Sequence, residues 1–429
     1  MKYYRIFALG CKVNSYESQA LRELLEKRGY QSASEETKTD VVILNTCSVT
    51  SVSDQKSRQK IRSLIEQYPD AIMVVMGCYA QMASDFVKTI PGVDILLGTQ
   101  NRHLIVDYID QFEKNKKQII DVKSYTRKET FEPLHISSYF ENTRAFLKIE
   151  DGCDNFCSYC LIPYARGNVR SREKEEIVNE VKRLVDHGYQ EIVLTGIHTG
   201  GYGQDLKNIT FAQLLKEILQ QESRLKRLRI SSIEESEIHD DMIEVMSQDE
   251  RVANHLHIPL QSGSPTVLKR MNRKYDTEQY YQRLCAIRNV RKDIAITTDI
   301  IVGFPGETEE EFLETYHFAQ KCAFADIHVF PFSSRSGTAA SRMKDQIDPQ
   351  TKKERVYRLL ALAEELRNAY QAQFENQEME VLFEEFDPIR KINKGHTSNY
   401  LSITVEGEES LHNQIRTVIY HQNGSALKE

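Results

Sequence analysis

Short apolar runs alternate with longer segments of mixed polarity along the first third of the chain. Asp40–Asn45 and Ala71–Met76 are almost entirely apolar, which is typical of strands buried on both faces of a parallel sheet. Tyr4–Leu9 predicts a third strand, and Glu17–Arg28 and Asp54–Gln67 predict the helices between them. Because strands and helices alternate, this part of the chain is expected to form a parallel α/β domain.

The same rhythm returns after a polar stretch over residues 101–143, which predicts a helix and a connecting segment. Six further apolar runs, separated by helical segments, predict β/α repeats that close into a partial (β/α)6 barrel. A site in such a barrel is expected where the strands end at their C-terminal mouths. The six predicted strands are Ala145–Ile149, Glu191–Thr195, Arg227–Ser231, His255–Pro259, Ala295–Val302 and Asp326–Phe330.

The last part of the chain changes character after a charged helix over Pro349–Phe374. Short runs at Glu378–Phe383, Tyr400–Val405 and Gln414–Tyr420 predict strands of a small all-β barrel. The expected fold class is therefore α/β, with three domains. These are an N-terminal α/β domain over residues 1–135, a barrel over 140–370 and a β-barrel over 375–429.

Composition and charge narrow the function classes. The chain has 429 residues, of which 40% are hydrophobic and 28% charged, with a net charge of −7, so indiscriminate nucleic-acid binding is not expected. No apolar run approaches the length of a membrane span, and the N-terminus lacks the pattern of a signal peptide, which favours the cytoplasm. Local basic segments over Arg166–Arg172 and Lys269–Lys274 support the hypothesis of a surface that binds RNA.

Three cysteines carry the most specific chemical signal. Cys153, Cys157 and Cys160 have the spacing C-x3-C-x2-C, and thiolates this close can hold three corners of a [4Fe–4S] cluster. No fourth cysteine follows nearby, so one iron is expected to stay open for a small molecule. Structural zinc sites usually pair two C-x2-C knuckles, a pattern that this loop lacks.

Three other cysteines follow predicted strands directly. Cys11, Cys47 and Cys78 each come just after the C-terminal end of a strand, where ligand sites of parallel sheets gather. We therefore expect them to converge on a second metal site, although each could alone be a small buried hydrophobe. The two remaining cysteines, Cys285 and Cys322, are expected in the core.

The cysteine loop at the end of the first barrel strand resembles the radical S-adenosylmethionine (SAM) superfamily. The resemblance implies that the open iron chelates SAM, whose reductive cleavage gives a 5′-deoxyadenosyl radical. Tyr159 matches the aromatic position that packs on the adenine of SAM. Cys153, Cys157 and Cys160 would then be both metal ligands and catalytic residues.

Further motifs extend the resemblance over essentially the whole chain. Leu9–Asn14, Asn45–Val49 and Gly77–Gln81, together with the cysteine loop, look like the methylthiotransferases. That family has an N-terminal domain, a radical SAM barrel and a C-terminal TRAM β-barrel. The resemblance implies a second [4Fe–4S] cluster on the three N-terminal cysteines, whose open iron carries the inserted sulfur. The substrate adenine is then expected between the two clusters.

The segment Gly-Cys-Lys-Val-Asn over residues 10–14 resembles enzymes for N6-threonylcarbamoyladenosine in tRNA. The match implies methylthiolation at C2 of this base at position 37, beside the anticodon, giving 2-methylthio-N6-threonylcarbamoyladenosine. The implied partners are the anticodon loop of tRNA, a reducing electron donor and a sulfur donor. Enzymes for isopentenyladenosine tend towards Gly-Cys-Gln-Met-Asn, and those for a ribosomal-protein aspartate towards Gly-Cys-Pro-Lys-Asn.

Residues at the expected barrel mouth are candidates for binding SAM. Each candidate alone is also common in turns and helix caps, so their shared position at strand ends carries the interpretation. The candidates are Thr195, Gly196, Ser232, Glu234, Gln261, Asp299 and Gly303.

Several alternatives stay open at this point. The same chemistry acts on isopentenyladenosine-37 of tRNA, or on a ribosomal-protein aspartate, in related families. A non-catalytic iron–sulfur protein that binds RNA and senses redox state is a different class, and a structural zinc protein is another. His255 and His257 share one face of a strand, but a metal site there needs further ligands that the sequence does not identify.

Overall fold

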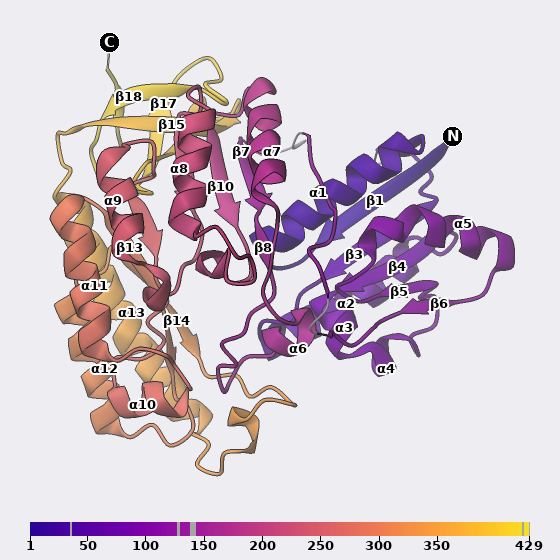
Figure 1. Cartoon of the computed structure of the whole chain (residues 1–429), viewed down its shortest axis with the longest axis horizontal. Coiled ribbons are helices and arrows are strands. Elements are labelled where there is room, and N and C mark those ends of the chain that lie inside the picture. The colour runs from indigo at the N-terminus through magenta and orange to yellow at the C-terminus, as the bar shows by residue number, and fades with distance from the viewer. Residues whose placement is uncertain (35–36, 127–128, 138–142, 423, 429) are drawn as a thin grey trace.

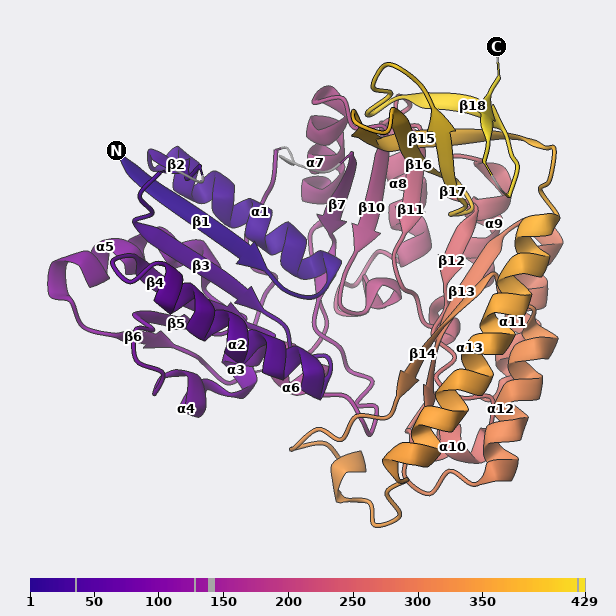
Figure 2. The same ribbon diagram turned by 180° about the vertical axis from the view of Figure 1, so that it is seen from behind.

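The computed structural model describes residues 1–34, 37–126, 129–137, 143–422 and 424–428 and contains an N-terminal sheet, a central barrel and a C-terminal sheet (Figure 1). All strands of the N-terminal sheet are parallel, in the order β2-β1-β3-β4-β5-β6, and helices cover both of its faces (Figure 2). Its strands are β1 (Lys2–Ala8), β2 (Tyr30–Ser32), β3 (Val41–Thr46), β4 (Ile72–Gly77), β5 (Ile95–Leu97) and β6 (Ile119–Asp121). Its helices are α1 (Lys12–Lys27), α2 (Ser51–Gln67), α3 (Cys78–Met82), α4 (Ser84–Val87) and α5 (Ile105–Asn115).

The register of this sheet brings three strand ends to one edge. β3 lies between β1 and β4, with Ala8 opposite Asn45 and Thr46 opposite Gly77. Every residue of β3 and β4 is buried, as their apolar sequences predict. The short strands β2, β5 and β6 were not predicted, because three-residue segments carry no clear periodicity.

The barrel is built from six parallel strands, as the sequence predicts. They form two hydrogen-bonded triples, β11-β10-β7 and β12-β13-β14, joined by isolated bridges such as that between Ser232 and His257. The strands are β7 (Arg144–Lys148), β10 (Glu191–Thr195), β11 (Arg227–Ile230), β12 (His255–His257), β13 (Ala295–Val302) and β14 (Asp326–Pro331). The main outer helices are α7 (Lys174–Asp186), α8 (Phe211–Gln221), α9 (Asp240–Gln248), α10 (Pro265–Arg270), α11 (Thr277–Val290), α12 (Glu309–Cys322) and α13 (Pro349–Ala372).

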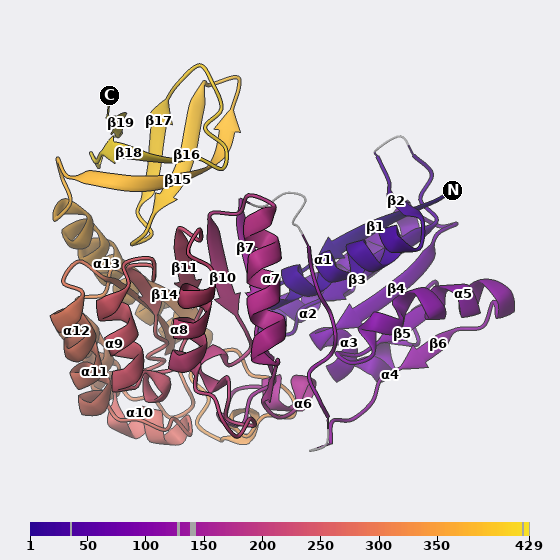
Figure 3. The same ribbon diagram turned by 45° about the horizontal axis from the view of Figure 1, so that its top comes forward.

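The C-terminal sheet is antiparallel and curled, in the order β17-β16-β15-β18-β19. It lies over the N-terminal ends of the barrel strands, away from their C-terminal mouths (Figure 3). Its strands are β15 (Glu378–Asp387), β16 (Ile392–Thr397), β17 (Ser402–Glu406), β18 (Ile415–Ile419) and β19 (Ala426–Leu427). β16 was not predicted, because Lys394 and Gly395 interrupt its apolar pattern.

A buried ionic cluster of the barrel is hydrogen-bonded to this sheet. Glu191 on β10 accepts hydrogen bonds from Arg229 at 2.6 Å and Arg227 at 3.0 Å on β11. Arg229 also donates to the backbone carbonyl oxygen of Ser398 in the C-terminal sheet at 3.0 Å. Burial alone would raise the pKa of Glu191, but the two arginines outweigh it and lower the pKa to about 2.

The expected domain boundary at residue 140 lies outside the described residues. Among the residues that are described, none of the helices combines the length and the apolar character needed to cross a bilayer.

Candidate functional site

The three N-terminal cysteines follow three adjacent strands. Cys11 is the N-cap of α1, Cys47 directly follows β3, and Cys78 begins α3 after β4. Gly10 has a φ of +105°, and a Cβ atom built on it would lie 2.7 Å from Sγ of Cys47. The two loops therefore touch, and the set of soft sulfur donors at one sheet edge fits an iron–sulfur cluster.

Arg166 contacts this set of cysteines and is fully buried. Its Nε donates to Sγ of Cys78 at 3.1 Å, and its Nη2 donates to Oδ1 of Asn14 at 3.0 Å. Its Nη1 donates to Glu17 at 2.8 Å and to Asp151 at 3.0 Å. Burial raises the pKa of Cys78, and the Arg166 guanidinium opposes that rise.

The carboxylates beside Arg166 extend this contact into a buried ionic network between the N-terminal sheet and the barrel. Glu17 of α1 pairs with Arg102 at 2.6 Å and with Lys148 of β7 at 2.8 Å. Lys148 also reaches Asp151 at 2.7 Å, just before the cysteine loop. Such a network fixes the relative position of its members, because leaving any one charge unpaired in the interior is costly.

The network overturns one sequence-based hypothesis. The segment Arg166–Arg172 was expected to offer a basic surface for RNA, but Arg166, Arg170 and Arg172 are only 0%, 7% and 1% exposed. Their charges are held by carboxylates: Arg166 and Arg170 lie by Asp151, and Arg172 pairs with Glu180 at 2.7 Å. Local charge density therefore reflected an internal ionic network.

The C-x3-C-x2-C loop begins after the short antiparallel pair of β8 (Glu150–Asp151) and β9 (Arg170–Ser171). Its three cysteines are half-buried, and the backbone N–H of Cys153 donates to the carbonyl oxygen of Gly167 at 2.9 Å. Nη1 of Arg273 donates to Sγ of Cys157 at 3.4 Å. Burial raises the pKa of Cys160 to about 12, so a bound metal is needed to hold this group as a thiolate near neutral pH.

Part of the second basic segment, Lys269–Lys274, supports this loop. The N–H of Ser158 donates to the carbonyl oxygen of Met271 at 2.9 Å. Nδ2 of Asn272 donates to the carbonyl oxygen of Phe156, also at 2.9 Å. The side chain of Arg273 is only 3% exposed and pairs with Glu234. Lys269 and Lys274 remain exposed.

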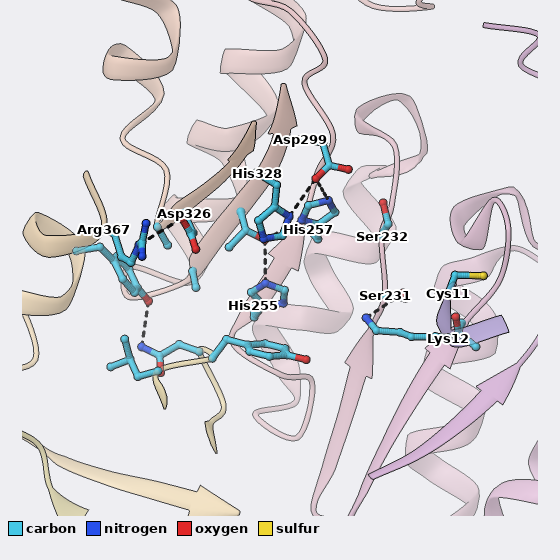
Figure 4. Close-up of a pocket in the computed structure, with 18 of the residues that line it drawn as sticks. Cys11, Lys12, Ser231, Ser232, His255, His257, Asp299, Asp326, His328 and Arg367 are labelled. Atoms are coloured by element: carbon cyan, nitrogen blue, oxygen red, sulfur yellow. Dashed lines mark hydrogen bonds and ion pairs between the residues drawn. The ribbon is translucent and has the colours of Figure 1, made fainter. Parts of the chain in front are cut away.

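A cavity of about 810 Å³ lies inside the barrel, between the N-terminal sheet and the C-terminal sheet (Figure 4). It brings together residues from all three parts of the chain, including Cys11 and Lys12 beside α1 and Asn399 and Tyr400 from the C-terminal sheet. Four of the predicted SAM contacts share this cavity with Cys11: Thr195, Gly196, Ser232 and Asp299.

The other four candidate contacts lie outside the cavity wall. The Tyr159 ring packs against an apolar cluster that includes Phe304 and Phe332. Glu234 is engaged by Arg273. The remaining two are held by backbone hydrogen bonds: Gln261 N–H to the carbonyl oxygen of Asp299 at 2.8 Å, and Gly303 N–H to Oε2 of Glu307 at 2.6 Å.

Asp299 joins two histidines in the cavity. Nε2 of His257 lies 3.2 Å from Oδ1 of Asp299, and Nδ1 of His328 lies 3.1 Å from the same atom. Burial alone would raise the pKa of Asp299, but the hydrogen bonds from both histidines outweigh it and hold the pKa well below its usual range. The three donor atoms lie within 4.8 Å of one another and so have the spacing that a metal ion requires. His255 instead bonds to Thr297 at 3.0 Å, and burial lowers its pKa.

Sequence reasoning missed the two arginines that donate to cysteine sulfurs, Arg166 and Arg273. It also missed His198, which lies 3.0 Å from Asn155 of the cysteine loop and pairs with Glu237. Burial lowers the pKa of His198, but Glu237 reverses that effect and raises it to about 8. Only the closeness of Arg166 to the cysteine loop, six positions after Cys160, could have indicated its role. The cysteine motif does not include this arginine.

Two family models match the chain. Residues 147–319 match the radical SAM superfamily, and residues 3–98 match the uncharacterized protein family UPF0004. The threonylcarbamoyladenosine tRNA methylthiotransferase MtaB of Bacillus subtilis (strain 168) is 48% identical, across 94% of this chain and 90% of that protein. This chain belongs to the radical SAM methylthiotransferase family.

Other relatives are consistent with this family. The MtaB protein of Thermotoga maritima is 38% identical, across 95% of this chain and 91% of that protein. A tRNA-2-methylthio-N(6)-dimethylallyladenosine synthase of Thermoanaerobacter sp. (strain X514) is 36% identical, across 97% and 89%. Membership of the radical SAM superfamily implies a [4Fe–4S] cluster and SAM as cofactors.

A solved structure supports the fold. The radical SAM methyltransferase TsrM of Kitasatospora setae superposes with a TM-score of 0.57 at 15% identity. The match covers 77% of this chain and 72% of TsrM. At this identity the likeness concerns the fold alone.

Proposed function

We propose that this enzyme methylthiolates C2 of N6-threonylcarbamoyladenosine at position 37 of tRNA, giving 2-methylthio-N6-threonylcarbamoyladenosine. The names and identities of the MtaB relatives support this substrate. The observation that carries the proposal is that Cys11, of the N-terminal cysteine set, lines the same cavity as Thr195, Ser232 and Asp299 of the barrel. A base in this cavity would be within reach of both halves of the site.

Each cysteine set would hold one [4Fe–4S] cluster. In the barrel, Cys153, Cys157 and Cys160 would hold the first, and in the N-terminal sheet Cys11, Cys47 and Cys78 would hold the second. When bound, the clusters and SAM supply one-electron chemistry at an unreactive C–H bond together with the sulfur to be inserted. An electron donor and a sulfur donor are therefore required partners.

The chain itself would position the reactants. Arg166 and Arg273 hold the sulfurs of Cys78 and Cys157 through hydrogen bonds. The ring of Tyr159 offers an apolar wall for the adenine of SAM. The further SAM contacts in the proposal are Thr195, Gly196, Ser232, Glu234, Gln261, Asp299 and Gly303.

The proposed domains follow the three sheets: residues 1–135 for the second cluster, 140–370 for the radical SAM barrel and 375–429 for a TRAM-like module. A tRNA substrate and the cytoplasm as the place of action belong to the same proposal. An anticodon-loop base suits this enzyme because it leaves its stack without the opening of a duplex.

Nucleoside analysis of tRNA from cells with and without the gene tests the substrate. Loss of 2-methylthio-N6-threonylcarbamoyladenosine alone, with its unthiolated precursor accumulating, is the expected result. Loss of 2-methylthio-N6-dimethylallyladenosine would instead assign the substrate of the second group of relatives. A change in neither nucleoside, but a changed ribosomal-protein aspartate, would move the activity to a protein.

A second assay separates an enzyme from an iron–sulfur protein that only binds RNA. The reconstituted protein is mixed with SAM, dithionite and the anticodon stem-loop, and 5′-deoxyadenosine is quantified. Formation of 5′-deoxyadenosine that depends on Cys157 supports the enzyme. Full cluster occupancy without any 5′-deoxyadenosine would contradict it.

A further inference from the structure

The charged side chains of the barrel cavity differ in how their charges are balanced. Asp299 is enclosed by two histidines, and Arg367 pairs with Asp326 at 3.4 Å. Nζ of Lys12 has one hydrogen bond among the described residues, to the neutral Oγ of Ser231 at 3.4 Å. Figure 4 shows the Lys12 side chain extending from beside Cys11 towards Ser231. Among the described residues, the Lys12 ammonium lines the cavity and has no carboxylate partner.

The surroundings of Lys12 add to its positive charge. Glu191 is the buried carboxylate on this side, and it is shared between Arg227 and Arg229, so one carboxylate faces two guanidinium groups. Lys12 is also the first residue of the sixteen-residue helix α1, whose N-cap makes no side-chain hydrogen bond. The free N–H groups of that helix end carry partial positive charge towards the same space. This end of the cavity therefore favours an anion.

We propose that Lys12 binds the carboxylate of the amino-acid arm on the substrate base and thereby selects an amino-acid-modified adenosine over a hydrocarbon-modified one. The inference rests on the proposed function. A threonylcarbamoyl group ends in one carboxylate, whereas a dimethylallyl group has no polar atom. Binding the dimethylallyl base would leave the Lys12 ammonium desolvated without a counter-charge. A site discriminates strongly against a ligand that leaves one of its buried polar groups unpaired.

Ser231 has a positioning role in this arrangement. Its Oγ accepts the hydrogen bond from Nζ and holds the long Lys12 side chain across the gap between the N-terminal sheet and β11. The lysine thus reaches the barrel although its backbone belongs to helix α1, whose N-cap is Cys11. The carboxylate would lie beside the cavity wall to which Cys11 contributes, so recognition of the arm fixes where the base is held.

The test measures binding, without turnover. The holoenzyme, without reductant, is titrated into three labelled anticodon stem-loops that carry threonylcarbamoyladenosine, its threonine-carboxamide analogue or dimethylallyladenosine at position 37. For the wild type we expect the acid to bind about 10- to 100-fold more tightly than the amide, the range of a hydrogen bond to a charged group. Lys12→Met should bind acid and amide equally, and Lys12→Arg should recover part of the preference. The control Arg367→Gln removes a cavity cation that already pairs with Asp326, and it should keep the wild-type preference for the acid.

SAM is titrated in parallel. Three outcomes would overturn the proposal: an acid preference that persists in Lys12→Met, an equal loss of affinity for acid and amide, or a loss of affinity for SAM alone. The second would assign Lys12 to an RNA phosphate, and the third to the carboxylate of SAM. Failure of the proposed function gives a different result from failure of the Lys12 role. The wild type would then favour the dimethylallyl stem-loop, or bind none of the three in preference. A wild type that prefers threonylcarbamoyladenosine to dimethylallyladenosine but binds the acid and the amide equally would retain the proposed function and reject the role of Lys12.

Discussion

Arg166 donates a hydrogen bond from Nε to Sγ of Cys78 across 3.1 Å, and the two residues belong to different parts of the fold. Cys78 starts a helix behind the N-terminal sheet, whereas Arg166 ends the helix α6 (Ile162–Arg166) that follows the barrel's cysteine loop. Six positions separate Arg166 from Cys160. The Arg166 side chain therefore links the segment after the barrel's cysteine loop to Cys78 of the N-terminal set. Its positive charge is balanced by Glu17 and Asp151.

Replacing Arg166 should destabilise both halves. Arg166→Met leaves Glu17 and Asp151 short of a counter-charge in the interior, and we expect the free energy of unfolding to fall by about 3–5 kcal/mol. Urea denaturation followed by circular dichroism measures the change. Arg390→Met, which removes an exposed ion pair with Asp387, is the matched control and should leave the midpoint unchanged. Equal midpoints for Arg166→Met and the wild type would contradict the assigned role.

The two cysteine sets should behave as separate metal centres. Cys47→Ala and Cys157→Ala should each halve the iron and sulfide bound after anaerobic reconstitution, because each change removes one ligand of one cluster. Both variants should lose the methylthiolated nucleoside. Cys285→Ala, a half-buried cysteine on α11, should keep the full metal content. Full iron in Cys47→Ala would remove the N-terminal set from the cluster.

Gly10 should be intolerant of a side chain for a reason of space as well as conformation. A Cβ atom there would lie 2.7 Å from Sγ of Cys47, so Gly10→Ala should displace this proposed metal ligand and lower the iron content. Gly29 shares the positive φ, at +88°, but has no neighbour within 4 Å of the added atom. Gly29→Ala should therefore cost only about 1–2 kcal/mol of stability and leave iron unchanged. Iron analysis and thermal unfolding of both variants separate crowding from backbone strain.

Glu191 predicts a defined pH dependence of stability. Its folded pKa of about 2 lies below the value of 4.5 for a free glutamate, so its contribution is present above pH 4.5 and is lost as the pH falls towards 2. At neutral pH, Glu191→Gln should lower the free energy of unfolding by about 3 kcal/mol. The difference from the wild type should shrink below pH 4.5, as urea titrations of the apoprotein at several pH values would measure. A difference that stays constant down to pH 2 would contradict the pairing with Arg229 and Arg227.

The exposed lysines of the Lys269–Lys274 segment remain candidates for contact with RNA. Lys269→Glu and Lys274→Glu should each weaken binding of the anticodon stem-loop and reduce the slope of log affinity against log salt by about 1. Lys114→Glu, at the distant end of α5, should change neither quantity. Filter binding over a series of salt concentrations provides the measurement. An unchanged slope in both variants would exclude this segment from the RNA-binding surface.

Local sequence patterns were sufficient for the larger elements of this fold. β3 and β4 are apolar throughout and are buried throughout, and the six barrel strands lie where apolar runs alternate with helical segments. Strands of three residues, such as β2 and β5, have too short a pattern to be predicted, and they form because a longer strand beside them offers free hydrogen-bonding groups.

The positions of the cysteines could also be anticipated, because parallel strands end at a common edge. Cys11, Cys47 and Cys78 follow β1, β3 and β4, and these strands are immediate neighbours in the sheet. The sequence did not provide the strand order itself, which depends on pairing between segments far apart in the chain.

By itself the sequence determined the longer strands of the N-terminal sheet, the strands of the barrel and which cysteines stand at strand ends, because each of these follows from local periodicity and chain geometry. Only the tertiary structure decided the environment of the charges. Arg166 and Arg172 are buried among carboxylates, whereas Lys12 reaches a cavity between three parts of the chain. The physical reason is that burial and pairing of a charge depend on residues more than a hundred positions away, such as Glu17 for Arg166 and Ser231 for Lys12.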